Sequence, residues 1–305
     1  MANTSNFLIF GGAGRLARAL VQTCPTGVFA TALPRQTLDL TDADAVRAAV
    51  RTFRPKAVLN AAAWTDVSGA QTHPEEAYAV NAHAPGRLAE ILREEGVELV
   101  HYSTDYVFSG NGSMPWSEEN LPAPRAQGVY GLSKALGEEK VLASRVAGVV
   151  IRAGWLHSGE RDFVAAILRA ALAGRSLTVT RSQIGTPTHT SALAAWTWKL
   201  LLQFGTTVPM KVVHYVEEGG WISRAEFADY VLKRATEQCE RLGQISRGRD
   251  LERIRTSMRV VDDDDGIRPL NCRLKTVHPY LPSCSHWQLG VDKSVEIVIN
   301  SELDV

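Results

Sequence analysis

The sequence predicts an α/β fold of the Rossmann type: a doubly wound parallel sheet with a smaller C-terminal lobe. Through the first half of the chain, short apolar runs such as "NFLIF" and "VELVHYS" alternate with segments of helical period. This alternation is typical of parallel sheets, because each crossover between parallel strands is long enough to hold a helix. A glycine turn, "FGGAGRLA", directly follows the first apolar run and opens the first helical segment.

The first half predicts five strands and four helices in alternation. Thr41 is the expected N-cap of the second helix, with Asp42 and Asp44 in its first turn, where the helix dipole favours negative charge. Pro74, followed by two glutamates, opens a long third helix. The expected strands are 6–10, 27–33, 56–62, 97–103 and 148–154, and the expected helices are 14–22, 42–53, 74–95 and 128–143.

The second half predicts helices over 161–174, 190–204 and 223–243, strands over 176–180 and 210–216, and a polar loop over 244–282. We place a boundary at Ala153, so that residues 1–153 form the nucleotide-binding domain. Residues 154–305 mainly form a substrate-binding lobe, with some segments returning to the first domain. The lobe should lie over the carboxyl edge of the sheet, where ligands bind in this class of fold.

Composition excludes several classes of function. The 305 residues include 33 Lys plus Arg and 33 Asp plus Glu, so no basic field favours nucleic acid or an anionic membrane. The four cysteines form no C-x-x-C pair, and the eight histidines form no i, i+4 pair around a carboxylate, so we expect no disulfide framework and no metal site. No signal peptide or membrane-spanning segment is expected, which predicts a cytoplasmic protein.

The glycine turn predicts a dinucleotide site. Gly11 permits the tight turn, and Gly14 lets the backbone approach a pyrophosphate at the start of a helix that begins with Arg15 and Leu16. Ala17, in place of a third glycine, is still small enough for packing of the helix on a strand. Three alanines, Ala61, Ala62 and Ala63, leave room for the cofactor after a later strand, although tight helix packing would also favour small residues.

The end of the second strand, "TALPRQ", lacks an acidic residue that would bind the ribose 2′-hydroxyl of NAD. Arg35 stands nearby and could accommodate a 2′-phosphate, so the sequence favours NADP(H), with NAD as the alternative. Asp39 and Leu40 could meet the adenine, or Asp39 could simply belong to the turn, and Arg35 could be an ordinary surface residue.

Tyr130 and Lys134, in "VYGLSKALGEE", are the expected catalytic pair. Residues four apart lie about 40° from each other around a helix, so both side chains share one face. The ammonium of Lys134 should favour the tyrosinate, and Thr104 supplies a hydroxyl from the preceding strand end, "LVHYSTDYVF". This set suits proton delivery to a carbonyl oxygen while a hydride reaches the carbon.

In combination these motifs resemble the dTDP-4-dehydrorhamnose reductase family of extended short-chain dehydrogenases, over nearly the full chain. The resemblance rests on "GGAGRLA", "VLNAAAWTDV", "EEAYAVNAHAPGRLA", "VHYSTDYVFSG", "VYGLSKALGEE", "VIRAGWLHS", "QIGTPTHTSALA" and "GIRPLNCRLKT". It implies NAD(P)H-dependent reduction of the 4-keto group of a dTDP-deoxysugar, above all dTDP-4-dehydro-L-rhamnose.

The resemblance also implies residue roles. Tyr130 would protonate the sugar O4, Thr104 would hydrogen-bond the same oxygen, and Lys134 would hold the cofactor ribose. The implied contacts to cofactor or sugar come from Thr65, Val67, Asp105, Tyr106 and the aromatic Trp155, which could instead be a core residue; Asn81 looks structural. Arg268, in "RPLN", is the candidate for the substrate diphosphate, because arginine suits bidentate contact with phosphate.

The chain departs from the family pattern at several positions, which leaves the sugar and any subunit contact open. Neutral Ser68 and Gln71 stand where an acidic pair is usual; the other departures are Trp64, Ser109, Cys272 and Lys275. Two other functions therefore remain: an NAD-retaining nucleotide-sugar epimerase or dehydratase, and a regulatory subunit of the methionine adenosyltransferase type. The expected partner is a small nucleotide sugar, and a homodimer is a further possibility.

Overall fold

The computed structural model describes residues 6–122, 126–204 and 211–303. Its centre is a six-stranded sheet of order β10-β5-β4-β3-β1-β2, in which every neighbouring pair is parallel. The predicted doubly wound α/β fold is confirmed. The strands of this sheet are β1 (Asn6–Phe10), β2 (Phe29–Leu33), β3 (Ala57–Asn60), β4 (Glu98–Thr104), β5 (Gly148–Ala153) and β10 (Val212–His214).

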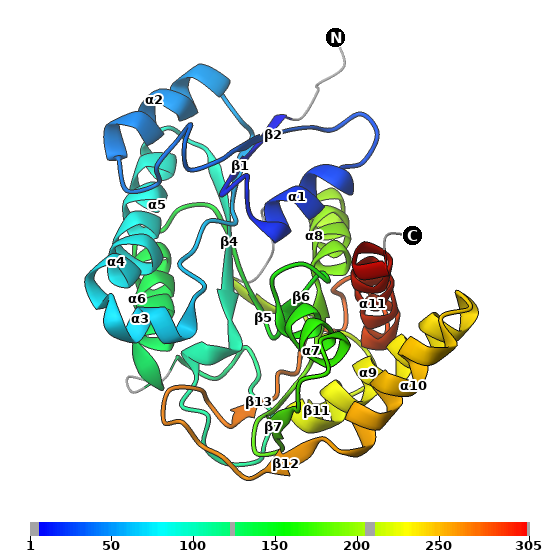
Figure 1. Cartoon of the computed structure of the whole chain (residues 1–305). Coiled ribbons are helices and arrows are strands. Elements are labelled where there is room, and N and C mark those ends of the chain that lie inside the picture. Colours follow the sequence, from blue (N-terminus) through cyan, green and yellow to red (C-terminus); the bar gives the residue numbers. More distant parts are fainter. Residues whose placement is uncertain (1–5, 123–125, 205–210, 304–305) are drawn as a thin grey trace.

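Successive side chains along each strand point to opposite faces of the sheet, so each strand contributes to two separate cores, one on each face. On β1, Phe7 and Ile9 pack with α1 (Arg15–Gln22) and α8 (Thr190–Phe204), whereas Leu8 and Phe10 pack toward the opposite face. That face is covered by α2 (Ala43–Phe53), α5 (Ala84–Glu94) and α6 (Gly128–Ala143), as Figure 1 shows. Both faces are therefore buried, which explains the continuous apolar runs.

Two local predictions in the first half need correction. The N-cap of α2 is Asp42 and not Thr41, since the Asp42 carboxylate accepts hydrogen bonds from the amides of Asp44 and Ala45. The predicted helix over 74–95 is divided into α4 (Pro74–Tyr78), a π-helical turn η1 (Ala79–His83) and α5. A short α3 (Val67–Thr72) precedes them.

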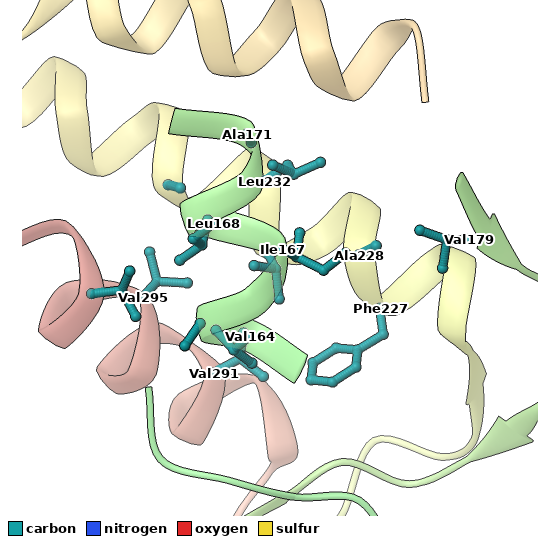
Figure 2. Close-up of a cluster of buried hydrophobic side chains, with 14 of the residues drawn as sticks. Val164, Ile167, Leu168, Ala171, Val179, Phe227, Ala228, Leu232, Val291 and Val295 are labelled. Carbon is teal, nitrogen blue, oxygen red and sulfur yellow. The ribbon is translucent and has the colours of Figure 1, made fainter. Parts of the chain in front are cut away.

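The second half forms a lobe around a separate apolar core. Figure 2 shows α7 (Phe163–Leu172) packed against α9 (Arg224–Arg241) and α11 (Trp287–Leu303) through residues such as Leu168, Phe227 and Val291. Short strands connect these helices: β6 (Leu156–His157), β7 (Thr178–Thr180), β8 (Ile184–Gly185), β9 (Thr188–His189), β11 (Ile222–Ser223), β12 (Arg259–Val261) and β13 (Asn271–Cys272).

The predicted loop over 244–282 is wrong in part, because it contains α10 (Ile245–Thr256), β12 and β13. α10 buries only Gly248, Leu251 and Ile254, a stripe too narrow to stand out in so polar a sequence. α11 was not predicted at all.

β10 and α8 return from the second half to the main sheet, and the expected strand over 210–216 starts at a residue outside the described ranges. The division of the chain at residue 153 stays a prediction. Within the described ranges, no helix is long and apolar enough to cross a membrane.

Candidate functional site

The glycine turn lies in close contact with the loop that follows β3. Gly11 has a φ of +80°, and a Cβ there would lie 2.8 Å from the Cα of Ala62. The turn is closed by a hydrogen bond of 2.7 Å from the Gly14 amide to the Gly11 carbonyl, and Gly14 is the N-cap of α1. The backbone therefore leaves its first helical amides at an open sheet edge, as binding of a pyrophosphate requires.

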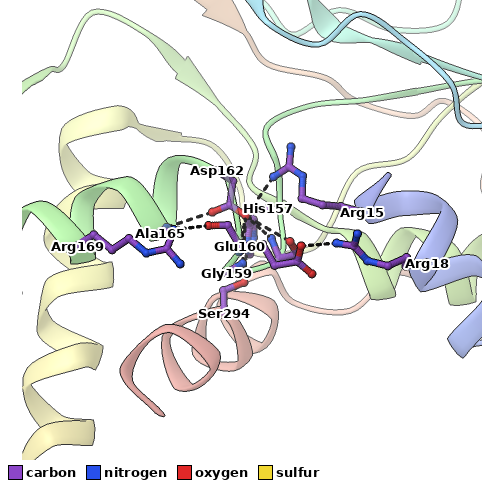
Figure 3. A network of polar contacts seen from close by, with 10 residues as sticks. Arg15, Arg18, His157, Gly159, Glu160, Asp162, Ala165, Arg169 and Ser294 are labelled. Carbon is purple, nitrogen blue, oxygen red and sulfur yellow. Dashed lines mark hydrogen bonds and ion pairs between the residues drawn. The ribbon is translucent and has the colours of Figure 1, made fainter. Parts of the chain in front are cut away.

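The two residues after the turn have different surroundings. The side chain of Leu16 is buried in the core between α1 and the sheet, so only its backbone can meet a ligand. Arg15 points to the lobe and donates to Asp162 Oδ2 over 3.1 Å, as Figure 3 shows.

At the end of β2, Arg35 and Asp39 form an ion pair with each other. Arg35 Nε lies 3.0 Å from Asp39 Oδ2, and the Arg35 side chain is 73% exposed. Asp39 also accepts hydrogen bonds from the amide and hydroxyl of Thr41, and these bonds hold the pKa of its carboxyl below the usual range. Asp39 thus belongs to the turn, Leu40 is buried, and Arg35 remains reachable from solvent.

Thr104, Tyr130 and Lys134 meet at the carboxyl end of β4. The Thr104 hydroxyl donates to Asp105 Oδ1 over 2.8 Å, and Lys134 Nζ donates to the Tyr102 carbonyl over 2.7 Å. The Tyr130 ring contacts the Tyr106 ring edge to face, with centroids 5.6 Å apart. These contacts place the three side chains near one end of β4, and their catalytic role stays a prediction.

The protonation of this set differs from the sequence expectation. Burial raises the pKa of Tyr130 to about 12, against the opposing effect of the Thr104 hydroxyl. Burial also lowers the pKa of Lys134 to about 8, although the carboxylate of Glu138 opposes this change. Lys134 was expected to lower the pKa of Tyr130, but burial is the larger effect and the ammonium is bound to the Tyr102 carbonyl. Tyr130 is consequently a protonated phenol at neutral pH.

The loop carrying Ala61, Ala62, Ala63, Thr65 and Val67 is braced by Asn81. Its amide accepts from the Trp64 amide over 2.8 Å and donates to the Trp64 carbonyl and to Ser133 Oγ. The expected structural role of Asn81 is therefore confirmed. Val67 packs at the edge of the same apolar cluster as Tyr130, whereas Thr65 is exposed.

With this geometry established, comparison with known proteins decides the family. The family model described as the RmlD substrate binding domain matches residues 5–295. The chain belongs to the dTDP-4-dehydrorhamnose reductase family. One relative, a dTDP-4-dehydrorhamnose reductase of Streptomyces griseus, is 38% identical over 218 residues, which are 70% of this chain and 71% of that protein.

Solved structures of this reductase family share the fold. The crystal structure of a reductase from Clostridium acetobutylicum superposes with a TM-score of 0.80 at 26% identity, over 96% of this chain and 99% of that one. The Bacillus anthracis reductase in complex with NADP gives a TM-score of 0.81 at 24% identity, again over 96% of this chain and 99% of that one.

On the lobe side of the reductase site, the remaining predicted residues occupy different settings. Asp105 is fully buried, and burial raises its pKa to about 6. Trp155 is 7% exposed and has a left-handed backbone with a φ of +33°, a strained conformation of the kind found near binding sites. Arg268 pairs with Asp265 and donates to Ser68 Oγ over 3.0 Å. No group of three or more His, Cys, Asp or Glu that could bind a metal occurs in the part described.

Sequence reasoning missed two residues of this region, Gln183 and Arg224. Gln183 donates to the Tyr106 hydroxyl over 3.2 Å and accepts from Arg224 Nε over 2.9 Å. Gln183 is the first residue of the motif "QIGTPT", and the family resemblance of this motif could have indicated that Gln183 lies near the site. Arg224 lies in no motif that we had connected with the site.

Proposed function

We propose that this protein reduces the 4-keto group of a dTDP-deoxysugar with NADPH, converting dTDP-4-dehydro-L-rhamnose to dTDP-L-rhamnose. The family membership supports this reaction, because several relatives are named dTDP-4-dehydrorhamnose reductases. The observation that carries the proposal is the convergence of Thr104, Tyr130 and Lys134 at one end of β4.

In the proposed reaction, Tyr130 is the general acid. The pKa of about 12 keeps its phenol protonated at neutral pH, so a proton is available at the start of a reduction. The sugar O4 accepts this proton, and the Thr104 hydroxyl hydrogen-bonds the same oxygen. When bound, the nicotinamide would supply the hydride that reduces C4. Lys134, protonated at neutral pH, stabilises the tyrosinate that remains until solvent reprotonates it.

The glycine turn fits the proposed cofactor, because a Cβ at Gly11 would fill the approach to Ala62. The backbone of Gly11 and Gly14, with the first residues of α1, would hold the pyrophosphate. Exposed Arg35 would contact the 2′-phosphate of NADP. The nicotinamide half would lie along Ala61, Ala62, Ala63 and Thr65, with its ribose hydroxyls at Lys134 and Tyr130.

The proposed sugar pocket is formed by residues from both halves of the chain: Thr65, Val67, Thr104, Asp105 and Tyr106, with Trp155 behind them. Because Trp155 is almost fully buried, we expect its ring to support the pocket and not to contact the sugar directly. A homodimer and a cytoplasmic location remain part of the proposal.

The test is NADPH oxidation in the presence of dTDP-4-dehydro-L-rhamnose and of two isomeric dTDP-4-keto sugars. We expect turnover of the first to exceed that of both isomers. An epimerase or dehydratase would instead purify with NAD that does not exchange, and would not oxidise added NADPH. A regulatory subunit would leave all three sugars unchanged.

A further inference from the structure

Arg224 is the first residue of α9 and is held there by a rigid turn. Ser223, the N-cap, accepts a hydrogen bond from the Glu226 amide, and the Glu226 carboxylate in turn accepts from the Ser223 amide over 2.7 Å. This capping box fixes the start of α9, and it therefore fixes the point from which the Arg224 side chain leaves the backbone.

The Arg224 guanidinium lies over two aromatic rings, those of Trp155 and Phe163. Its Cζ is 3.6 Å from the centroid of the Trp155 ring and 4.9 Å from that of Phe163. The contact covers a face of the ring that the family resemblance assigned to the sugar. Gly185 makes room for this arrangement, because a Cβ there would lie 2.8 Å from Trp155 Cε2.

Arg224 is linked to the proposed general acid through two side chains. Its Nε donates to Gln183 Oε1 over 2.9 Å, and Gln183 Nε2 donates to the Tyr106 hydroxyl over 3.2 Å. The Tyr106 ring then contacts the Tyr130 ring. The cation is thus connected to Tyr130 through one amide side chain and one aromatic ring.

The charge of Arg224 is poorly compensated within the protein. The Arg224 side chain is half-buried. In the part of the chain that the structure describes, no carboxylate forms an ion pair with it. Asp105 is the acidic side chain whose charge acts on Arg224, but no ion pair joins the two groups, so Asp105 compensates the cation only from a distance. A half-buried guanidinium without a carboxylate partner favours an anionic ligand.

Other arginines near the site are already engaged. Arg15 pairs with Asp162, Arg268 with Asp265, and Arg152 with Glu138. Arg268, the residue that the sequence suggested for the diphosphate, would have to give up its carboxylate to bind a phosphate. Arg224 would not, since its Nε bond to the neutral Gln183 leaves the terminal nitrogens outside any ion pair.

We propose that Arg224 binds the sugar-side phosphate of the nucleotide-sugar diphosphate, with Trp155 serving as the stacking support of its guanidinium. This inference rests on the proposed function. In a pyranose, C4 and the diphosphate-bearing C1 lie at opposite positions of the ring. A site that places Tyr130 at O4 therefore needs a cation on the far side of the sugar ring, and Arg224 is joined to Tyr130 only through Gln183 and Tyr106. The planar guanidinium suits bidentate contact with a phosphate.

The experiment compares binding of dTDP and dTMP by calorimetry to the full-length protein saturated with NADP⁺. dTMP lacks the sugar-side phosphate, so the ratio of the two dissociation constants isolates that group. We expect wild-type protein to favour dTDP, and Arg224→Gln to weaken dTDP binding about 10-fold or more while changing dTMP binding less than about 3-fold. Arg181→Gln is the matched control, because Arg181 is an exposed lobe arginine paired with Asp262, and it should keep the wild-type ratio.

Arg224→Lys tests the geometry of the contact and guards against loss of fold. It keeps the charge without the planar fork, so the ratio should fall between those of wild type and Arg224→Gln, with an unchanged melting temperature. An unchanged ratio in both Arg224 variants would overturn this inference alone, as would loss of the ratio in Arg268→Gln with Arg224→Gln unaffected. A wild-type protein that did not distinguish dTDP from dTMP would overturn the inference alone. Failure to oxidise NADPH with any of the dTDP-4-keto sugars would overturn the proposed function and the inference that rests on it.

Discussion

Arg15, directly after the glycine turn, forms an ion pair of 3.1 Å with Asp162, the N-cap of α7 in the lobe (Figure 3). Asp162 also accepts hydrogen bonds from the amides of Ser158, Gly159 and Ala165. A second pair, Arg18 with Glu160, joins α1 to the segment directly before α7. The helix expected to meet the cofactor is therefore fastened to the lobe expected to meet the sugar.

Replacement of Asp162 should loosen this connection. Burial raises the pKa of Asp162, but the amides of Ser158 and Ala165 and the charge of Arg15 together hold it below the usual range. A carboxyl whose pKa is lower in the folded state stabilises the protein at pH values above its unfolded-state pKa. This stabilisation is lost as the pH falls through the folded-state pKa. Asp162→Asn should therefore cost about 1–3 kcal/mol near pH 7, with a smaller difference below about pH 4. Urea unfolding at both pH values measures this, and a difference independent of pH would contradict it.

Loss of the proton from the Lys134 ammonium should determine the alkaline limb of the pH profile of kcat/KM. Its ammonium should be lost as pH rises through about 8, so kcat/KM for the free enzyme should fall over that range. Lys134→Arg keeps the charge and should move the limb to higher pH, with lower activity overall. Because the folded-state pKa lies below the unfolded one, folding stability should rise between about pH 8 and 10. Steady-state rates across this range measure the limb, and an identical limb in Lys134→Arg would exclude Lys134 as its source.

The exposed Arg35 side chain should determine the preference of the protein for NADPH over NADH. Arg35→Ala removes the exposed cation at the end of β2 and should lower the preference for NADPH over NADH by about 10-fold, the loss of roughly one charge-assisted phosphate contact. It also releases Asp39, whose negative charge would then disfavour the 2′-phosphate further. Dissociation constants for both cofactors measure the ratio; equal losses for NADPH and NADH would show that Arg35 does not recognise that phosphate.

A buried ion pair supports the helix that carries Tyr130. Arg152 on β5 lies 2.6 Å from Glu138 on α6, and both side chains are at most 2% exposed. Glu138→Gln leaves a buried cation without its partner and should cost about 3–5 kcal/mol. The double variant Glu138→Leu with Arg152→Met should be more stable than Glu138→Gln, and urea unfolding compares them. A smaller loss for Glu138→Gln than for the double variant would contradict this assignment.

The parts of the fold and site that could be predicted from sequence are those in which spacing along the chain determines position in space. The glycine turn of Gly11 and Gly14 and the helical spacing of Tyr130 and Lys134 are local, and alternating strands and helices bring them to one edge of the sheet. Arg224 and the Arg15–Asp162 pair are contacts between distant segments, which no local pattern encodes. The pKa of Tyr130 could not be predicted either, because burial depends on packing in three dimensions.

The general-acid role of Tyr130 is the centre of this account, and one substitution tests it directly. Tyr130→Phe removes the phenolic proton while preserving the ring that packs on Tyr106. In NADPH oxidation with dTDP-4-dehydro-L-rhamnose, we expect kcat to fall by about 100-fold or more, with the NADPH dissociation constant within about 3-fold of wild type. A kcat close to that of wild type would contradict the account.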